Sequence, residues 1–483
     1  MKSIWNSKRG LGWIVTAFFI AADMVGGGLV AMPVAFLNTG LVMGCFIMLV
    51  LATLFAYTAY LLGINWVIMQ ERWPEYQEHC RKPYPEMALR SMGTKMKVFT
   101  SFIVCATMFG TAVVYILLST RIFQSFLGSI FDVQIPFCLL LVVVTINIMP
   151  LAYLKSPADF WFEFSIDVNL EKTNEMLVVI ISLGCTVLAI LMSIGGIAVD
   201  TPACFPEAKY PPLSIWETLY SLGTFFFAFS GHQVLPTIQH DMYRPKEFTK
   251  SVILGFIIIS ILYMPISIYA FLVYGDSMSG SVMDSIQTPA VRHVANISIA
   301  LHCILALIMM ANPLCQQAED FFNVPHTFGL KRVVVRTSII LAMLFMALLL
   351  PNFGPFMNLA GSITNLTVCV ILPMLFNLYI EASVVDRKNG QYKIPSFAEI
   401  VNRTNKAKLA VSTFIVVTAI FGTILCVYLS LKEVLTVRFT PPCFFSSFDS
   451  RQFGENFDTH HIRCCGSERN ILSIVNSTGV CYA

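Results

Sequence analysis

The chain has 483 residues, of which 56% are hydrophobic and 12% are charged, and its formal net charge is +3. A typical soluble domain carries about 25% charged residues, so this composition excludes an ordinary soluble globular protein. It indicates a chain embedded in a lipid bilayer, and we expect no nucleic acid among its partners.

Eleven predominantly apolar runs are long enough to cross a bilayer as helices, since about 20 residues span roughly 30 Å of hydrocarbon. In chain order they are 11–37, 41–65, 98–120, 134–154, 176–198, 214–238, 250–274, 293–315, 333–351, 357–381 and 409–432. The first run is too long for a cleavable signal peptide and a second span follows it at once, so we expect it to be retained. The predicted fold class is therefore all-α integral membrane, with a segment 1–10, a membrane domain 11–432 and a tail 433–483.

The first predicted span contains Gly26, Gly27 and Gly28, and Pro33 follows Gly28 by five residues. Glycine weakens a helix by about 1 kcal/mol relative to alanine, and proline by roughly 3 kcal/mol, so this helix should break near its middle. Asp23, the only acidic residue in the span, lies about one turn before the glycines. An ionisable group is costly within the bilayer. We therefore expect Asp23 to bind a coupling ion or the substrate's ammonium group, with a structural hydrogen bond as the alternative.

The sixth span repeats the pattern, because Gly231 follows Ser230 and lies five residues before Pro236. A break at membrane depth frees N–H and C=O groups that lipid cannot satisfy, so protein or a cavity must surround it. Freed N–H groups can receive a carboxylate, and freed carbonyls an ammonium group or a cation. The broken spans open successive five-helix blocks, which predicts a 5+5 inverted repeat plus one extra helix, with a site between the repeats. Close packing of helices is the alternative explanation for each glycine.

Two histidines within predicted spans are further candidates for ion coupling, His232 in the sixth and His302 in the eighth. Ser298 lies four residues before His302, on the same helical face. Histidine titrates near neutral pH, so each ring is a candidate proton relay, and a structural histidine is the alternative. The chain has no CxxC, HExxH or GxxxxGK[ST] sequence. We therefore expect no metal or cofactor beyond a coupling proton or sodium ion, and no ATP-driven pump.

Most of the 31 Lys and Arg residues fall in the N-terminal segment and the even-numbered loops, above all 66–97 and 382–408. Basic loops stay in the cytoplasm, which predicts a cytoplasmic N-terminus and a non-cytoplasmic tail. Three acidic residues are expected at water-exposed cytoplasmic helix ends: Glu319, Asp320 and Glu381.

The predicted outer tail contains four cysteines and the glycosylation sequence Asn476-Ser477-Thr478. In an oxidising compartment these cysteines could pair with one another or with a cysteine of the outer loop 199–213. The residues concerned are Cys443, Cys464, Cys465 and Cys481 in the tail and Cys204 in the loop. The alternative is a tail of free thiols with a chance glycosylation sequence.

Several stretches, in order and spacing, resemble a known family. They are MVGGGLVAMPVAF at 24–36, FAFSGHQVLP at 227–236, RPKEF at 244–248, YGD at 274–276, LPNFGPF at 350–356 and GS at 361–362. The resemblance is to the amino acid/auxin permease family, whose fold is that of the bacterial leucine transporter. It implies that the following residues line a substrate pocket: Gly26, Gly27, Gly28, Phe229, Ser230 and Gly231. Many relatives carry a neutral polar residue near position 23, so Asp23 departs from the family pattern.

The sequence thus predicts a secondary active transporter that moves a small amino acid by alternating access, in the plasma membrane or a vesicular or lysosomal membrane. A membrane amino acid sensor or scaffold without turnover is the alternative. An integral-membrane enzyme is not expected, because no catalytic residues show a persuasive spacing. The small amino acid substrate and the bilayer are the expected partners, and the sequence leaves protein partners unknown.

Overall fold

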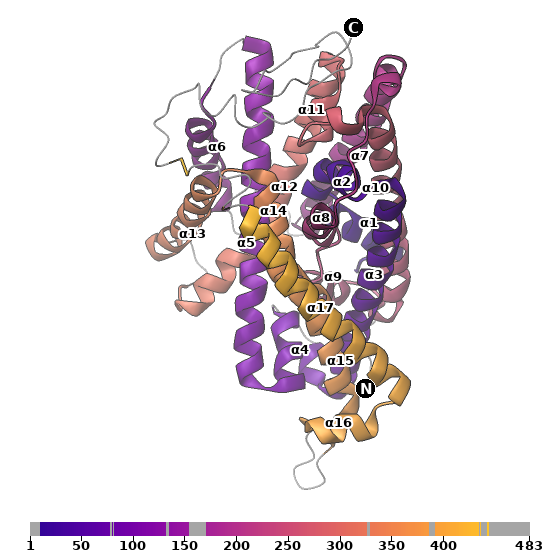
Figure 1. Ribbon diagram of the computed structural model, residues 1–483. Helices are drawn as coiled ribbons and strands as arrows, with labels where there is room; N and C mark the ends of the chain where they lie inside the picture. The colour runs from indigo at the N-terminus through magenta and orange to yellow at the C-terminus, as the bar shows by residue number, and fades with distance from the viewer. Residues whose placement is uncertain are drawn as a thin grey trace.

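The computed structural model describes residues 10–77, 80, 82–131, 135–153, 171–325, 329–385, 392–433, 435 and 442–443 (Figure 1). Within these residues the regular structure is helical except for β1 (Val384–Val385) and β2 (Tyr392–Lys393), one short antiparallel pair. Residues 1–9 and most of the tail, with Cys464, Cys465, Cys481 and Asn476, lie outside the described residues.

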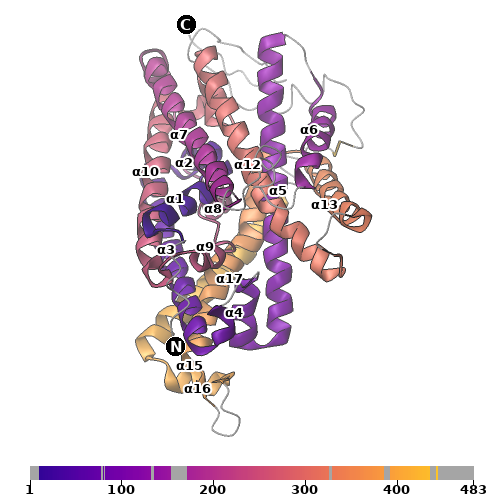
Figure 2. The same cartoon turned by 180° about the vertical axis from the view of Figure 1, so that it is seen from behind.

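The first half of the chain forms α1 (Trp13–Met24), α2 (Gly27–Thr39), α3 (Leu41–Arg72), α4 (Pro83–Met92), α5 (Thr94–Phe131), α6 (Phe137–Ala152), α7 (Glu171–Cys204), α8 (Ile215–Ala228) and α9 (Leu235–His240). The second half forms α10 (Phe248–Tyr274), α11 (Val282–Ser285), α12 (Pro289–Phe321), α13 (Leu330–Leu349), α14 (Phe353–Ala360), α15 (Leu372–Ala382), α16 (Phe397–Arg403) and α17 (Lys406–Lys432). The long helix α5 stands upright in both views, α12 crosses it at a slant, and α6 and α13 pack beside α5 (Figures 1 and 2).

Every predicted span coincides with a helical segment, although the count of crossing helices differs. Among the described residues, eight helices are long and apolar enough to cross a membrane, and α1 with α2 makes a ninth crossing bent by 63°. The predicted span 134–154 is the shorter helix α6, and 214–238 is the interrupted pair α8 and α9. These two fall below the length of a single spanning helix because α6 has 16 residues and α8 only 14.

The tenth span is continuous but irregular in its hydrogen bonding. Between α14 and α15 the chain forms π-helical turns over Gly361–Asn365 and Thr367–Ile371. Such turns leave backbone groups out of the regular α pattern and are frequent at functional sites. Tyr84 of α4 is fully buried and donates a hydrogen bond to the carbonyl of Val368 in this segment.

The acidic residue Glu319 is buried, contrary to the expectation that water surrounds it. Its carboxylate accepts hydrogen bonds from Arg332 at 3.1 Å and from Arg336 at 2.5 Å, and its side chain is 1% exposed. Helix α12 continues past the predicted end at residue 315, and α13 packs its first turns against that extension. Asp320 and Glu381 are partly exposed, and they pair with Lys82 and Lys408.

A disulfide joins Cys443 to Cys138 at the start of α6, with 5.7 Å between the Cα atoms. The expected pairing of Cys443 with another tail cysteine or with Cys204 is therefore wrong. Cys138 was overlooked because it lies within an apolar run rather than in a loop. The Cys443 amide also donates to the Leu348 carbonyl at 2.9 Å, so the bond attaches the chain after α17 to α6 and α13. Cys204 is disulfide-bonded as well.

Candidate functional site

The first span breaks between α1 and α2, as predicted. Helix α1 ends at Met24, Val25 is extended, and α2 begins at Gly27. The amide of Val25 still donates to the Ala21 carbonyl at 2.9 Å, whereas Gly26 starts the new direction of the chain. The Leu29 amide donates to the Gly26 carbonyl at 3.0 Å, so the amides of Gly27 and Gly28 open α2 and direct the positive end of its dipole toward the break.

The sixth span breaks over residues 229–234, between α8 and α9. Gly231 has φ of +153°, a backbone conformation that residues with a Cβ rarely adopt. A Cβ on Gly231 would also lie 2.8 Å from Oδ2 of Asp23 and 2.9 Å from the Met24 side chain. Both the backbone conformation and the close approach of α1 therefore require glycine at this position.

The two breaks are in direct contact with each other. A Cβ on Gly28 would lie 2.7 Å from the Ala228 Cβ, so these helices meet with no room for a side chain. The Tyr263 hydroxyl from α10 donates to the Met24 carbonyl at 3.0 Å and lies 3.4 Å from the Ala228 carbonyl. The Tyr263 hydroxyl thus lies within hydrogen-bonding distance of one backbone carbonyl at each break. The contact at Gly28 favours the packing explanation for that glycine, and Gly27 makes ordinary contacts with Phe227.

Asp23 lies between the two breaks, on the side that faces Gly231. Its Oδ2 atom is buried and has no hydrogen-bond partner within the part of the chain that the structure describes. Among the described residues this oxygen therefore makes no structural hydrogen bond, which was the alternative to a binding role. A buried carboxylate oxygen of this kind can accept a proton, a cation or an ammonium group.

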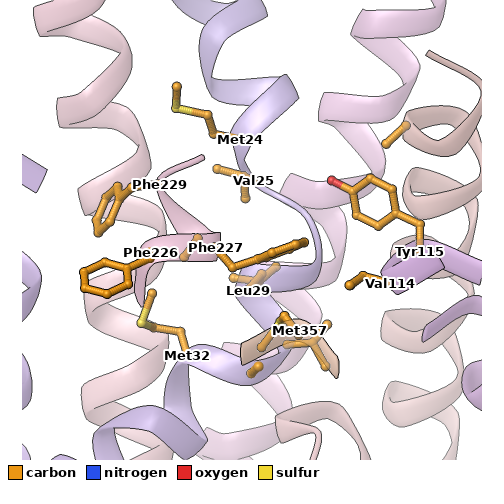
Figure 3. Close-up of a cluster of buried hydrophobic side chains, with 14 of the residues drawn as sticks. Met24, Val25, Leu29, Met32, Val114, Tyr115, Phe226, Phe227, Phe229 and Met357 are labelled. Carbon is orange, nitrogen blue, oxygen red and sulfur yellow. The ribbon is translucent and has the colours of Figure 1, made fainter. Parts of the chain in front are cut away.

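Phe229 and Ser230 contribute to the break mainly through their backbone. The Phe229 ring is fully buried among Phe55, Phe256 and Tyr263, with centroid distances of 6.1 to 6.3 Å. The Ser230 hydroxyl donates to the Phe227 carbonyl at 2.8 Å. Figure 3 shows Phe226 and Phe229 on one side of the break in the first span, and Val114 and Tyr115 on the other.

The His232 ring is hydrogen-bonded to helix α3. Its Nε2 lies 3.1 Å from the Thr58 hydroxyl oxygen and 3.1 Å from the Phe55 carbonyl. Because Thr58 donates its own proton to Phe55, both oxygens act as acceptors and the ring proton belongs on Nε2. These contacts favour the structural explanation for His232, although its buried Nδ1 has no partner among the described residues.

His302 contacts the site from α12. Its Nδ1 lies 2.9 Å from the Ser182 hydroxyl and 2.8 Å from the Thr186 hydroxyl, both from α7. A Cβ on Gly26 would lie 2.8 Å from the His302 Nε2 and 2.9 Å from the Tyr115 hydroxyl. Ser298 instead donates to the Val294 carbonyl of its own helix at 2.7 Å.

The structure thus brings Asp23 and His302 together with the glycines of both helix breaks, Gly26–Gly28 and Gly231. It adds residues that the sequence analysis did not identify. The overlooked residues are Tyr115, Ser182, Thr186 and Tyr263. A tyrosine at the centre of an apolar span was a usable signal for Tyr263, whereas Ser182 and Thr186 resemble ordinary helix residues. No cluster of three or more potential metal ligands occurs among the described residues.

A sequence profile of the transmembrane amino acid transporter protein family matches residues 9–419. The chain belongs to this family. It is accordingly a multi-pass integral membrane protein of a non-enzymatic family, as predicted. The match confirms the resemblance read from the motifs around the two breaks.

Individual relatives of the chain are plant proteins of the same kind. It is 27% identical over 184 residues to auxin transporter-like protein 3 of Medicago truncatula, a match that covers 37% of this chain and 40% of that relative. It is 22% identical over 374 residues to the amino acid transporter AVT3C of Arabidopsis thaliana, which covers 75% of this chain and 81% of the relative.

Solved transporter structures share the fold at low sequence identity. MhsT, crystallised with L-phenylalanine, superposes with a TM-score of 0.51 and 11% identity, over 88% of this chain and 100% of MhsT. Mhp1 in an inward-facing conformation superposes with a TM-score of 0.51 and 12% sequence identity, over 92% of this chain and 95% of Mhp1. These matches confirm the fold predicted from the resemblance to the leucine transporter.

Proposed function

We propose that the protein is a secondary active transporter that moves a small amino acid across a membrane by alternating access, coupled to a proton or sodium gradient. The observation that carries the proposal is the meeting of the two helix breaks. Beside them lie an Asp23 carboxylate oxygen and a His302 ring nitrogen, neither of which has a hydrogen-bond partner among the described residues. A zwitterion needs opposite charges close together, and a site with this arrangement offers them.

The substrate's carboxylate fits the first break, where α2 begins at Gly27 and presents the amides of its first residues and the positive helix end. Its ammonium group fits the Asp23 carboxylate beside Gly231. Backbone at Gly26 and Gly27 and at residues 229–231 lines this place, and Gly28 lets α2 approach Ala228 of α8. Apolar side chains crowd it, including Val25, Leu29 and Phe227, and this crowding supports a small substrate (Figure 3).

The names of the relatives support this class of substrate. AVT3C is named an amino acid transporter, and the Medicago relative is named auxin transporter-like. Auxin is itself a small carboxylate, so a carboxylate is the chemical group that these substrates share. We accordingly propose a substrate with a free carboxylate, for which the first break supplies the donors.

The proposed orientation places the N-terminus in the cytoplasm and the tail on the other side. The Cys138–Cys443 disulfide supports it, because disulfides persist in oxidising compartments and Cys443 belongs to the tail. Both the plasma membrane and a vesicular or lysosomal membrane place the tail on such a side.

Uptake by proteoliposomes tests the proposal. Purified full-length protein is reconstituted, and labelled amino acids are offered under an inward proton gradient, an inward sodium gradient or no gradient. Accumulation above the external concentration under one gradient is expected, with protein-free vesicles as the control. Specific binding of an amino acid without flux, from folded and correctly oriented protein, would instead identify a sensor or scaffold.

A further inference from the structure

His302 is the most deeply enclosed ionisable side chain with a free hydrogen-bonding atom at the first break. The residue is 0% exposed, and its Nε2 has no partner among the residues that the structure describes. That nitrogen is directed at Gly26, where α1 has ended and α2 begins. Burying a polar atom without a hydrogen-bond partner costs free energy. Because Nε2 points at the break, a ligand bound there would supply the missing partner.

The hydrogen bonds from α7 fix which nitrogen of the ring carries the proton. The one hydroxyl proton of Thr186 has the Ser182 carbonyl as an acceptor at 3.0 Å, which leaves lone pairs for the His302 Nδ1 at 2.8 Å. The Ser182 hydroxyl at 2.9 Å can rotate to accept from Nδ1 too, and the Ser182 carbonyl at 3.3 Å can only accept. We therefore assign the proton of the neutral ring to Nδ1, so that Nε2 presents a lone pair to the break.

The charge on the His302 ring decides whether a carboxylate can bind beside it. A lone pair on Nε2 repels a carboxylate at the first turn of α2, whereas a protonated Nε2 donates a charge-assisted hydrogen bond to it. We infer, on the basis of the proposed function, that His302 binds the coupling proton on Nε2 and holds the substrate's carboxylate at the Gly26 break.

The loaded site is then electrically balanced. The imidazolium of His302 pairs with the substrate's carboxylate, and the carboxylate of Asp23 pairs with its ammonium group, so no charge stays unpaired in a dry interior. The proton comes from water on one side of the membrane and returns to water on the other, and no covalent bond of the substrate changes. Proton and substrate therefore favour each other's binding by the same factor, which is the requirement for symport.

Other titratable groups around the break come from several elements. They are Tyr115 from α5, Asp23 from α1, Tyr263 from α10 and Cys303 from α12 itself. Helix α7 presents the hydroxyl groups of Ser182 and Thr186 to the ring. The tyrosines and the cysteine are neutral donors near neutral pH, which leaves His302 as the group that can become cationic beside the carboxylate.

The test replaces His302 by glutamine, which keeps a permanent N–H donor but cannot take up a proton. Wild-type protein in proteoliposomes should concentrate substrate under an inward proton gradient, and its apparent affinity should fall about tenfold per pH unit above the pKa of the site. His302→Gln should still exchange labelled for unlabelled substrate, with a KM that changes less than about twofold over two pH units, but should not concentrate it.

His293→Gln is the matched control, because it makes the same chemical change nine residues earlier on α12, where the ring packs against Phe126. It should keep proton-driven accumulation and its pH dependence. A second variant, Thr186→Val, removes the hydroxyl acceptor at Nδ1 and should shift the pH at which KM begins to rise, while exchange at low pH is retained.

Proton-driven accumulation by His302→Gln would overturn the inference, and so would a wild-type protein driven by sodium alone. If His302→Gln shows no exchange because it does not fold, an unshifted pH profile of Thr186→Val would count against the inference. Absence of any flux in wild-type protein would overturn the proposed function itself and the inference with it, so the two failures are distinguishable.

Discussion

The contact between the two broken spans predicts that alanine is tolerated at Gly27 and not at Gly28. A Cβ on Gly28 would lie 2.7 Å from the Ala228 Cβ and 2.8 Å from its Cα. This is about 0.7 Å inside the closest ordinary contact, and one of the two atoms belongs to the backbone. A Cβ on Gly27 would meet the Phe227 ring at 3.4 Å, the Val114 side chain at 3.6 Å and the Tyr115 ring at 3.7 Å, all of them ordinary contacts.

The magnitudes follow from two opposing effects. Alanine gains up to about 1 kcal/mol over glycine in a helix, at either position. Overpacking costs about 1–3 kcal/mol, and it applies only at Gly28. Gly27→Ala should therefore be neutral or slightly stabilising, whereas Gly28→Ala should lose up to about 2 kcal/mol, a shift of a few degrees in the thermal midpoint.

The assay is thermal unfolding of both purified variants in detergent, followed by uptake in proteoliposomes. Gly28→Ala should unfold at lower temperature than wild type and transport more slowly, because α2 and α8 are pushed apart at the site. Equal thermal midpoints and equal uptake for the two variants would refute the close contact of the two breaks.

Three further predictions concern buried polar groups. Asp23→Asn should abolish gradient-driven accumulation while the variant stays folded, because its Oδ2 makes no structural hydrogen bond among the described residues; a loss of folded protein equal to the loss of transport would contradict this. Tyr263→Phe should cost about 1–3 kcal/mol by leaving the carbonyls at the breaks unsatisfied, and thermal unfolding against wild type would measure it. Glu319→Gln should cost about 3–5 kcal/mol because two buried arginines lose their anion, whereas the neighbouring Asp320→Asn, in a partly exposed pair, should cost less than about 1 kcal/mol; similar thermal midpoints for these two variants would show that the Glu319 pair is not buried.

The candidate site was only partly predictable from the sequence. Gly26, Gly28 and Gly231 were predictable because glycine and proline weaken a helix wherever they occur. Asp23 was predictable because a charge in an apolar span is rare. The hydrogen-bond partners of these residues were less predictable: a tyrosine at the centre of an apolar span was a usable signal for Tyr263, but Ser182 and Thr186 resemble ordinary helix residues.

Two features were misjudged for a similar reason. Glu319 was expected in water because it lies beyond an apolar run, but a longer α12 and the start of α13 bury it against two arginines. Cys138 was overlooked as a disulfide partner because it is 305 residues from Cys443, and no local pattern relates the two. In both cases a contact between segments far apart in the sequence determined the state of the side chain: the burial of Glu319 and the disulfide of Cys138.

The sequence by itself determined that the chain is embedded in a membrane, where its spans lie and which two of them break. These properties depend on runs of neighbouring residues, because hydrophobicity and helix propensity act over a few turns. Only the tertiary structure decided that the breaks touch at Gly28 and Ala228, that Asp23 faces Gly231, and that α7 fixes the ring proton of His302. Those relations join residues more than one hundred positions apart, and only the packing of the helices brings them into contact.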